Sequence, residues 1–185
     1  ANKRACYEAL RDVLEETTNP MTDRNVPVAA INGIRLVRPN AKGSDSDKQL
    51  LDECVATLWK YFEKKGGASD QQVQAHVPPA VAQLLGRGGD AKGTYKDRFA
   101  HELAGKYGKK HIFVNQSCAM ALGILCEPAE SSKDDKKYSD ALLKYYRSGR
   151  DEQTRSFCLM SLANIGGNAN RNELLKALDK GNKAV

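Results

Sequence analysis

Two stretches of the sequence, VNQSCAMALGIL at residues 114–125 and TRSFCLMSLANI at residues 154–165, repeat one helical pattern. The residues that recur are Cys118 and Cys158, Met120 and Met160, and Leu122 and Leu162. A second segment with helical periodicity follows each copy and contains the triplet Leu-Leu-Lys, at 142–144 and at 174–176. A repeated helix pair is typical of an α-solenoid, in which each unit buries its apolar face against its neighbours. The sequence therefore predicts repeats at 110–149 and 150–182.

Helical periodicity extends over the rest of the chain. It predicts helices at about residues 3–16, 23–37, 49–65, 70–85, 94–106, 110–125, 137–147, 151–165 and 171–179. Pro78-Pro79 indicates a kink or a new helix start within 70–85. The predicted fold class is all-α: one right-handed α–α superhelix, over residues 1–185, of about four to five helix pairs. The alternative is an irregular helical bundle that contains one duplicated pair.

The composition restricts the classes of function. Hydrophobic residues make up 41% of the chain, which is enough for a core, and no apolar run is long enough to cross a membrane. We therefore expect no membrane partner. The formal net charge is +6. Residues 87–110 contain seven basic and three acidic side chains. Such a segment can attract phosphate groups or acidic protein surfaces, and it can also be a solvated face.

The cysteines and histidines do not form a recognisable site. The five cysteines are widely spaced and without a Cys-x-x-Cys, which argues against a disulfide framework or a zinc ribbon. We expect them to be buried thiols in a reducing, cytoplasmic compartment. His76, His101 and His111 lie far from one another in sequence, so no cofactor or metal is predicted. The glycine-rich stretch 86–94 separates its lysine from its threonine and is interpreted as a turn between helices rather than a phosphate-binding loop.

The ends of the two repeated helices resemble a known family. Leu162-Ala-Asn-Ile-Gly-Gly167, echoed by Leu122-Gly-Ile-Leu125, is similar to the end of the first helix of a HEAT-type repeat. Small residues (Ala121, Gly123 and Ala163) would let neighbouring helices approach closely. The resemblance implies a rigid scaffold that grips other macromolecules, although the family also includes bilin lyases and alkyl-base DNA glycosylases.

From these features we predict a non-catalytic scaffold that binds a protein with an acidic surface. The predicted contact residues are basic side chains of the 87–110 segment and two tyrosines taken to be exposed, namely Arg87, Lys92, Lys96, Arg98, Lys109, Lys110, Tyr145 and Tyr146. A nucleic-acid-binding solenoid that uses the basic segment is the alternative. An enzyme of the lyase or glycosylase type is a third possibility, which requires His101 or His111 beside a carboxylate in a cleft.

Apolar residues in the first and last predicted helices also need a partner. These residues include Leu10 and Leu14 near the start, and Leu174, Leu175 and Leu178 near the end. Terminal repeats of a solenoid have polar outer faces. We therefore expect the chain to be part of a longer protein or of a larger assembly.

Overall fold

The computed structural model describes residues 2–16, 23–64, 67–105 and 111–182. Within these ranges the chain forms helices, turns and loops, without a strand. The helices are α1 (Lys3–Glu16), α2 (Asn25–Val37), α3 (Asp45–Glu63), α4 (Ala68–Gln74), α5 (Val77–Leu85), α6 (Thr94–Leu103), α7 (Ile112–Leu125), α8 (Lys136–Ser148), α9 (Glu152–Ile165) and α10 (Asn168–Asn182). The predicted all-α class is therefore confirmed for the described part of the chain.

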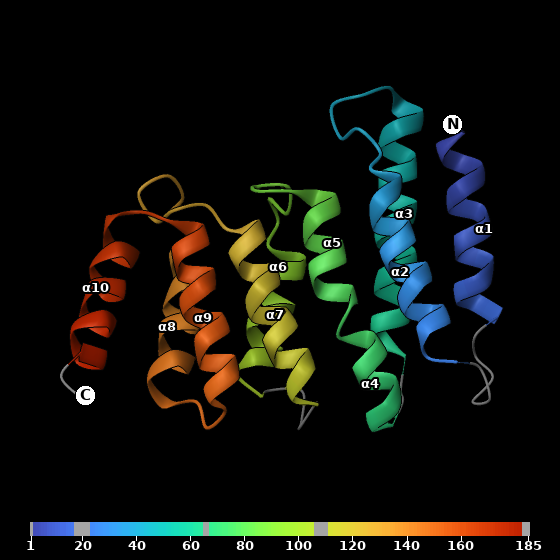
Figure 1. Ribbon diagram of the computed structural model, residues 1–185. Helices are drawn as coiled ribbons and strands as arrows, with labels where there is room; N and C mark the ends of the chain where they lie inside the picture. Colours follow the sequence, from blue (N-terminus) through green and yellow to red (C-terminus); the bar gives the residue numbers. More distant parts are fainter. Residues whose placement is uncertain (1, 17–22, 65–66, 106–110, 183–185) are drawn as a thin grey trace.

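The helices follow one another along an elongated molecule, with α1 at one end and α10 at the other (Figure 1). Helices α5, α7 and α9 lie side by side in one layer, and α6 and α8 lie behind them (Figure 1). The contacts agree with this view, because α7 packs against α5, α9 and α6, while α8 packs against α9 and α6. Helices α7 and α9 thus each touch a neighbour on both sides and a helix behind them (Figure 1).

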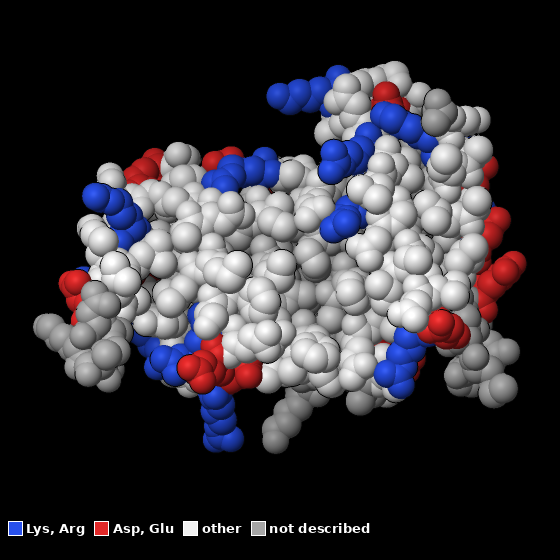
Figure 2. All heavy atoms as spheres, viewed as in Figure 1, with Lys and Arg blue, Asp and Glu red and all other residues white. Residues whose placement is uncertain are grey.

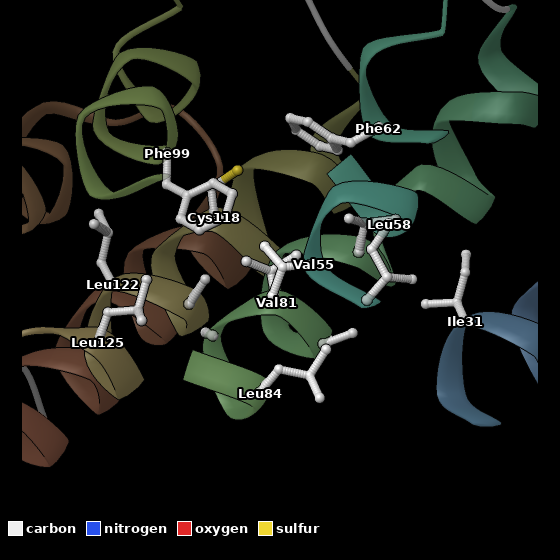
Figure 3. Close-up of a cluster of buried hydrophobic side chains, with 14 of the residues drawn as sticks. Ile31, Val55, Leu58, Phe62, Val81, Leu84, Phe99, Cys118, Leu122 and Leu125 are labelled. Carbon is white, nitrogen blue, oxygen red and sulfur yellow. The ribbon is translucent and has the colours of Figure 1, made fainter. Parts of the chain in front are cut away.

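A continuous apolar core fills the space between the helices. Figure 3 shows part of it, where Leu58 and Phe62 of α3 lie near Phe99 of α6 and Leu122 of α7. These four side chains are fully buried. The core contains side chains from α1 through α9, so the helices form one packed body rather than separate units.

The two repeated helices, α7 and α9, lie directly against each other. A Cβ atom at Gly123 would lie 2.8 Å from the Cα atom of Ser161, so only glycine allows this approach. The Ser161 hydroxyl donates a hydrogen bond to the Ala119 carbonyl (2.8 Å), and the Asn164 amide donates one to the Gly123 carbonyl (2.8 Å). The close approach predicted at Gly123 is confirmed, whereas Ala163 is exposed and does not contribute to it.

The contacts do not decide where one repeat ends and the next begins. Helix α8 packs closely on α9, which follows it after a short turn, and α6 packs in the same way on α7. In a stack of helices each element touches both neighbours, so the contacts are compatible with more than one repeat boundary. The repeat boundaries 110–149 and 150–182, and the HEAT-type superhelix itself, stay predictions.

Local signals explain where most helices start. The predicted break at the proline pair is a new start, since α4 ends at Gln74 and Pro78 lies in the first turn of α5. Helix α3 begins earlier than predicted because the Ser44 side chain accepts a hydrogen bond from the Asp47 amide. Helix α6 is capped by Asp90, whose carboxylate accepts hydrogen bonds from the Tyr95 and Lys96 amides at the start of that helix.

The structure bears on two sequence predictions: that the cysteines are buried, and that the apolar residues of the last helix need a partner. Cys6 is exposed, whereas Cys54, Cys118, Cys126 and Cys158 are buried as expected. Burial raises the pKa of the Cys126 and Cys158 thiols to about 12, so both stay protonated at neutral pH. At the last helix, Leu175 and Leu178 remain largely exposed.

Candidate functional site

The predicted basic residues do not form one surface, and Arg87 illustrates why. Its guanidinium crosses from the glycine-rich turn to the end of α9, where it donates hydrogen bonds to the carbonyls of Ile165 (3.0 Å) and Asn164. Carbonyls at a helix C-terminus lack partners within the helix and carry partial negative charge. The charge of Arg87 therefore stabilises α9.

Lys96 is buried, contrary to its predicted role in contacting a partner. Its ammonium nitrogen lies 2.6 Å from a carboxylate oxygen of Asp135, and the two side chains are only 6% and 3% exposed. The other Asp135 oxygen accepts a hydrogen bond from the Glu127 amide (2.8 Å). The pair joins α6 to the loop before α8, so Lys96 is not accessible to an acidic protein surface.

The remaining predicted cations differ in accessibility. Arg98 is half-buried and forms ion pairs with Glu63 and Glu102, at 2.9 and 2.8 Å. Lys92 is exposed. Lys109 and Lys110 lie outside the described residues.

Lys92 lines an open hollow of about 520 Å³ between the glycine-rich turn and the 127–135 loop. Its lining contains four basic side chains (Lys92, Lys96, Lys133 and Lys137) and three acidic ones (Glu127, Asp134 and Asp135). Lys137, also at this hollow, pairs with Asp97 (2.8 Å). The hollow is therefore close to electrically neutral and is not specifically suited to phosphate.

Exposed positive charge is concentrated instead on α8 and the residues beside it. The exposed cations are Lys133, Lys136, Lys137, Lys144, Arg147 and Arg150. The exposed acids of the same stretch are Asp134 and Asp140. Three of the cations pair with carboxylates at their sides: Lys136 with Asp140, Lys137 with Asp97, and Arg147 with Glu173.

These ion pairs keep the acidic partners charged. The hydrogen bond with Lys137, followed in importance by that from Tyr138, holds the pKa of Asp97 below its usual value. The hydrogen bonds with Lys176 and Arg147 lower the pKa of Glu173 in the same way. Lys144 does not take part in these pairs, so its ammonium group is the cation of α8 best placed to meet an external carboxylate.

An apolar groove lies beside Lys144, between α6 and α8. Its volume is about 250 Å³. It is lined by Ala100 and Leu103 from α6, by Ala104 just after it, and by Ala141, Lys144, Tyr145, Ser148 and Gly149 from α8 and its end. The alanines leave space, because larger side chains at those positions would fill the gap between the helices. The result is an apolar depression with one ammonium group at its edge.

Tyr145 forms a wall of this groove and is half-buried rather than fully exposed as predicted. A Cβ atom at Gly149 would clash with the Tyr145 ring, so glycine allows the ring to keep its position. Tyr146 is also half-buried, and the Arg155 guanidinium lies 5.6 Å from the centre of its ring. Of the two predicted aromatic contact residues, only Tyr145 lines the groove.

The histidines do not form a catalytic arrangement with the hollows described above. None of those hollows is lined by a histidine. His111 caps α7, with its Nδ1 atom accepting a hydrogen bond from the Phe113 amide. Over the described residues, no group of three His, Cys, Asp or Glu side chains could hold a metal ion.

Comparisons with protein-family models, with curated proteins and with solved structures find no match to this chain. The candidate site is therefore defined by its geometry alone. Among the described helices, none is both long enough and apolar enough to span a membrane.

Sequence reasoning missed Lys144 and the α6 residues of the groove. One signal was present, because the 133–150 segment contains six basic residues and surrounds Tyr145. The number of cations alone favoured the 87–110 segment, since the sequence did not show that Arg87, Lys96 and Arg98 have partners within the fold.

Proposed function

We propose that the chain is a HEAT-type helical scaffold that binds an acidic segment of another protein in the groove between α6 and α8, without catalysis. The observation that carries this proposal is the apolar groove beside the exposed Lys144 ammonium group. An apolar side chain of the partner would enter between Leu103 and Tyr145. Acidic residues next to it would meet Lys144 and the other cations of α8.

The combination of groove and charge supports a protein partner. Burial of an apolar side chain supplies binding free energy, and complementary charge increases the association rate and selects the partner. Half-buried aromatic residues at the edge of a small depression are common energetic centres of protein interfaces. Tyr145 fits this description because its ring is already held in place by packing.

The arrangement of the helices supports the scaffold part of the proposal. The similar helices α7 and α9 are packed directly against each other, as successive units of a stack would be. A stack of this kind is rigid, so the groove exists before a partner arrives and little ordering is needed on binding. The five free thiols are compatible with a reducing, cytoplasmic location, which belongs to the same proposal.

A peptide selection tests this function. The purified chain would be used to select from a displayed library of peptides that each carry one large apolar residue flanked by Asp and Glu. We expect enriched peptides whose affinity falls about tenfold with Lys144→Glu, a loss of about 1.4 kcal/mol. The charge-matched control is Lys42→Glu, which changes an exposed lysine in the loop before α3 and should leave binding unchanged.

Either of two results would count against the proposal. If the selected peptides lacked acidic residues, the cations of α8 would not contribute to binding. Equal loss of binding with Lys42→Glu and Lys144→Glu would mean that net charge matters and the groove does not.

Nucleic-acid binding is the second candidate, favoured by the six exposed cations along 133–150. Phosphate contacts release counterions, so this function requires affinity for an oligonucleotide that falls steeply as salt rises. Half of those cations already pair with carboxylates of the chain, which weakens this candidate. Measuring oligonucleotide and peptide binding over the same salt series separates the two functions.

A further inference from the structure

The front layer of helices has an outer surface that is almost free of charge. Helices α5 and α7 contain no Asp, Glu, Lys or Arg, and α9 contains only Glu152 and Arg155, both in its first turn. Figure 2 shows this surface as a broad white area with charged groups around its edge. We call the outward side chains of α5, α7 and α9 the uncharged face; they include Gln83, Phe113, Met120, Ser156, Met160 and Ala163.

Large apolar side chains project from this face. Met120 is 38% exposed and Met160 is 62% exposed, and they occupy the same position in the two repeated helices. Helix α7 packs against α5, α9, α6 and α4, and Phe113 precedes Met120 by seven residues, or two turns, so the two exposed side chains lie on the same side of the helix. Phe113, at 44% exposure, continues the apolar surface toward the start of α7.

A helix that is apolar on all sides is normally buried on all sides. Helix α7 has no charged residue, and its polar residues Asn115, Gln116 and Ser117 lie together in its first half, yet Phe113 and Met120 are exposed to solvent. Monomeric proteins rarely expose a wide apolar surface, whereas interfaces between identical subunits are more apolar than other surfaces and poor in charge. The exposed apolar side chains therefore indicate that a partner binds the uncharged face.

We propose that the uncharged face binds a second copy of this chain in a two-fold symmetric dimer. In a two-fold dimer a surface meets itself, and any charge near the axis meets its own copy. A face with almost no charge avoids that repulsion, so two copies can meet on it without burying like charges against each other. The flexible thioethers of Met120 and Met160 can adapt to each other across the axis.

The size of the face is adequate for such a dimer. Helices α7 and α9 have 14 residues each and α5 has 9, so with the usual rise and spacing they cover about 500 Å² in projection. Side-chain relief increases the accessible area toward the roughly 800 Å² per subunit of a standard interface. The groove between α6 and α8 lies in the other layer, so this proposal does not depend on the proposed function.

Light scattering coupled to size-exclusion chromatography tests the dimer with the purified chain. We expect the wild type to show the mass of a dimer, and Met160→Glu to raise the dimer dissociation constant about 100-fold, because symmetry buries two carboxylates in one interface. Met120→Lys should act similarly. Val13→Glu is the matched control, because Val13 is 37% exposed on α1, which packs against α2 and α3 at the end of the molecule (Figure 1), and its substitution should leave the dimer intact.

Circular dichroism checks that each variant is folded. We expect all of them to fold, because the substituted side chains are exposed. A wild type that is monomeric at every concentration would overturn the proposal and leave the face to a different partner. A dimer that persists in both methionine variants would overturn it as well, since the interface would then lie elsewhere.

Discussion

Lys96 and Asp135 form a buried ion pair, with 2.6 Å between the ammonium nitrogen and the carboxylate oxygen. Removing a charge from water is costly, and the attraction between the two groups offsets this cost only while both are present. The pair also organises its surroundings, because the Asp135 carboxylate holds the Glu127 amide and the Lys96 ammonium group lies 5.3 Å from the centre of the Tyr138 ring.

Breaking this pair should destabilise the fold more than breaking a surface pair. We expect Lys96→Met to lower the free energy of unfolding by about 3 kcal/mol, because Asp135 is then buried without a countercharge. Adding Asp135→Asn should restore part of the loss. Urea denaturation measures both effects.

Lys136 provides the control for this experiment. Its pair with Asp140 is exposed and spans one helical turn, so Lys136→Met should cost no more than about 0.5 kcal/mol. Similar losses for Lys96→Met and Lys136→Met would contradict the structural role of the buried pair.

Asp151 caps α9 through hydrogen bonds that its carboxylate accepts from the Thr154 hydroxyl and the Thr154 amide. The hydroxyl hydrogen bond is the main reason that the pKa of Asp151 lies below its usual value. Asp151→Ala should lower the free energy of unfolding by about 1 kcal/mol at neutral pH, as expected for an N-cap residue. Thermal or urea unfolding measures the difference.

The same cap predicts a pH dependence with a definite sign. A carboxylate whose pKa is lowered by folding stabilises the native state above its unfolded pKa, about 3.9 for Asp, and this contribution is lost as the pH falls below that value. The stability difference between wild type and Asp151→Ala should therefore narrow below about pH 4. If the stability difference between wild type and Asp151→Ala stayed constant below about pH 4, the charge of Asp151 would not contribute to the cap.

The contact between α7 and α9 depends on the absence of a side chain at Gly123. Gly123→Ala would bring a methyl group against the backbone of Ser161, and the helices would have to separate. We expect a loss of about 1–3 kcal/mol in the free energy of unfolding, typical of overpacking. Ala163→Ser, at an exposed position of α9, should change stability by less than about 0.5 kcal/mol. Equal stability of Gly123→Ala and wild type would contradict the close packing.

Helices were predictable because their signals are local. The apolar spacing within α1 and the glycine and proline punctuation around α5 lie within a few residues of the boundaries that they determine. The predicted and observed ranges of α1 and α9 agree to within one residue. The start of α6 at residue 94 was predicted as well, although its cap comes from Asp90, which lies outside the helix in the preceding turn.

The candidate site was predictable only in part, because it depends on contacts between residues that are far apart in the sequence. Tyr145 was identified from the sequence, yet Ala100 and Leu103, which also line the groove, belong to α6. Lys96 and Asp135 are separated by 39 positions, and Arg87 and Ile165 by 78. No local pattern shows which cations such contacts neutralise, so the basic segment 87–110 looked more available than it is.

Considered as a whole, the molecule has two layers with different surfaces. The front layer of α5, α7 and α9 is almost free of charge on the outside (Figure 2), whereas α8, in the layer behind it (Figure 1), carries most of the exposed cations described above. This division lets one layer associate with a second copy while the groove between α6 and α8 stays open. A dimer would then present two grooves, which would increase the avidity for a partner with two acidic segments.

The most direct test of the account is a nuclear magnetic resonance titration of the isotope-labelled chain with a selected acidic peptide. Chemical shift changes of backbone amides report which residues contact the peptide. We predict that the changes are concentrated at the end of α6 and along α8, around Leu103, Lys144 and Tyr145. Changes concentrated on α5, α7 and α9, or spread over all exposed lysines, would contradict a binding site in the groove.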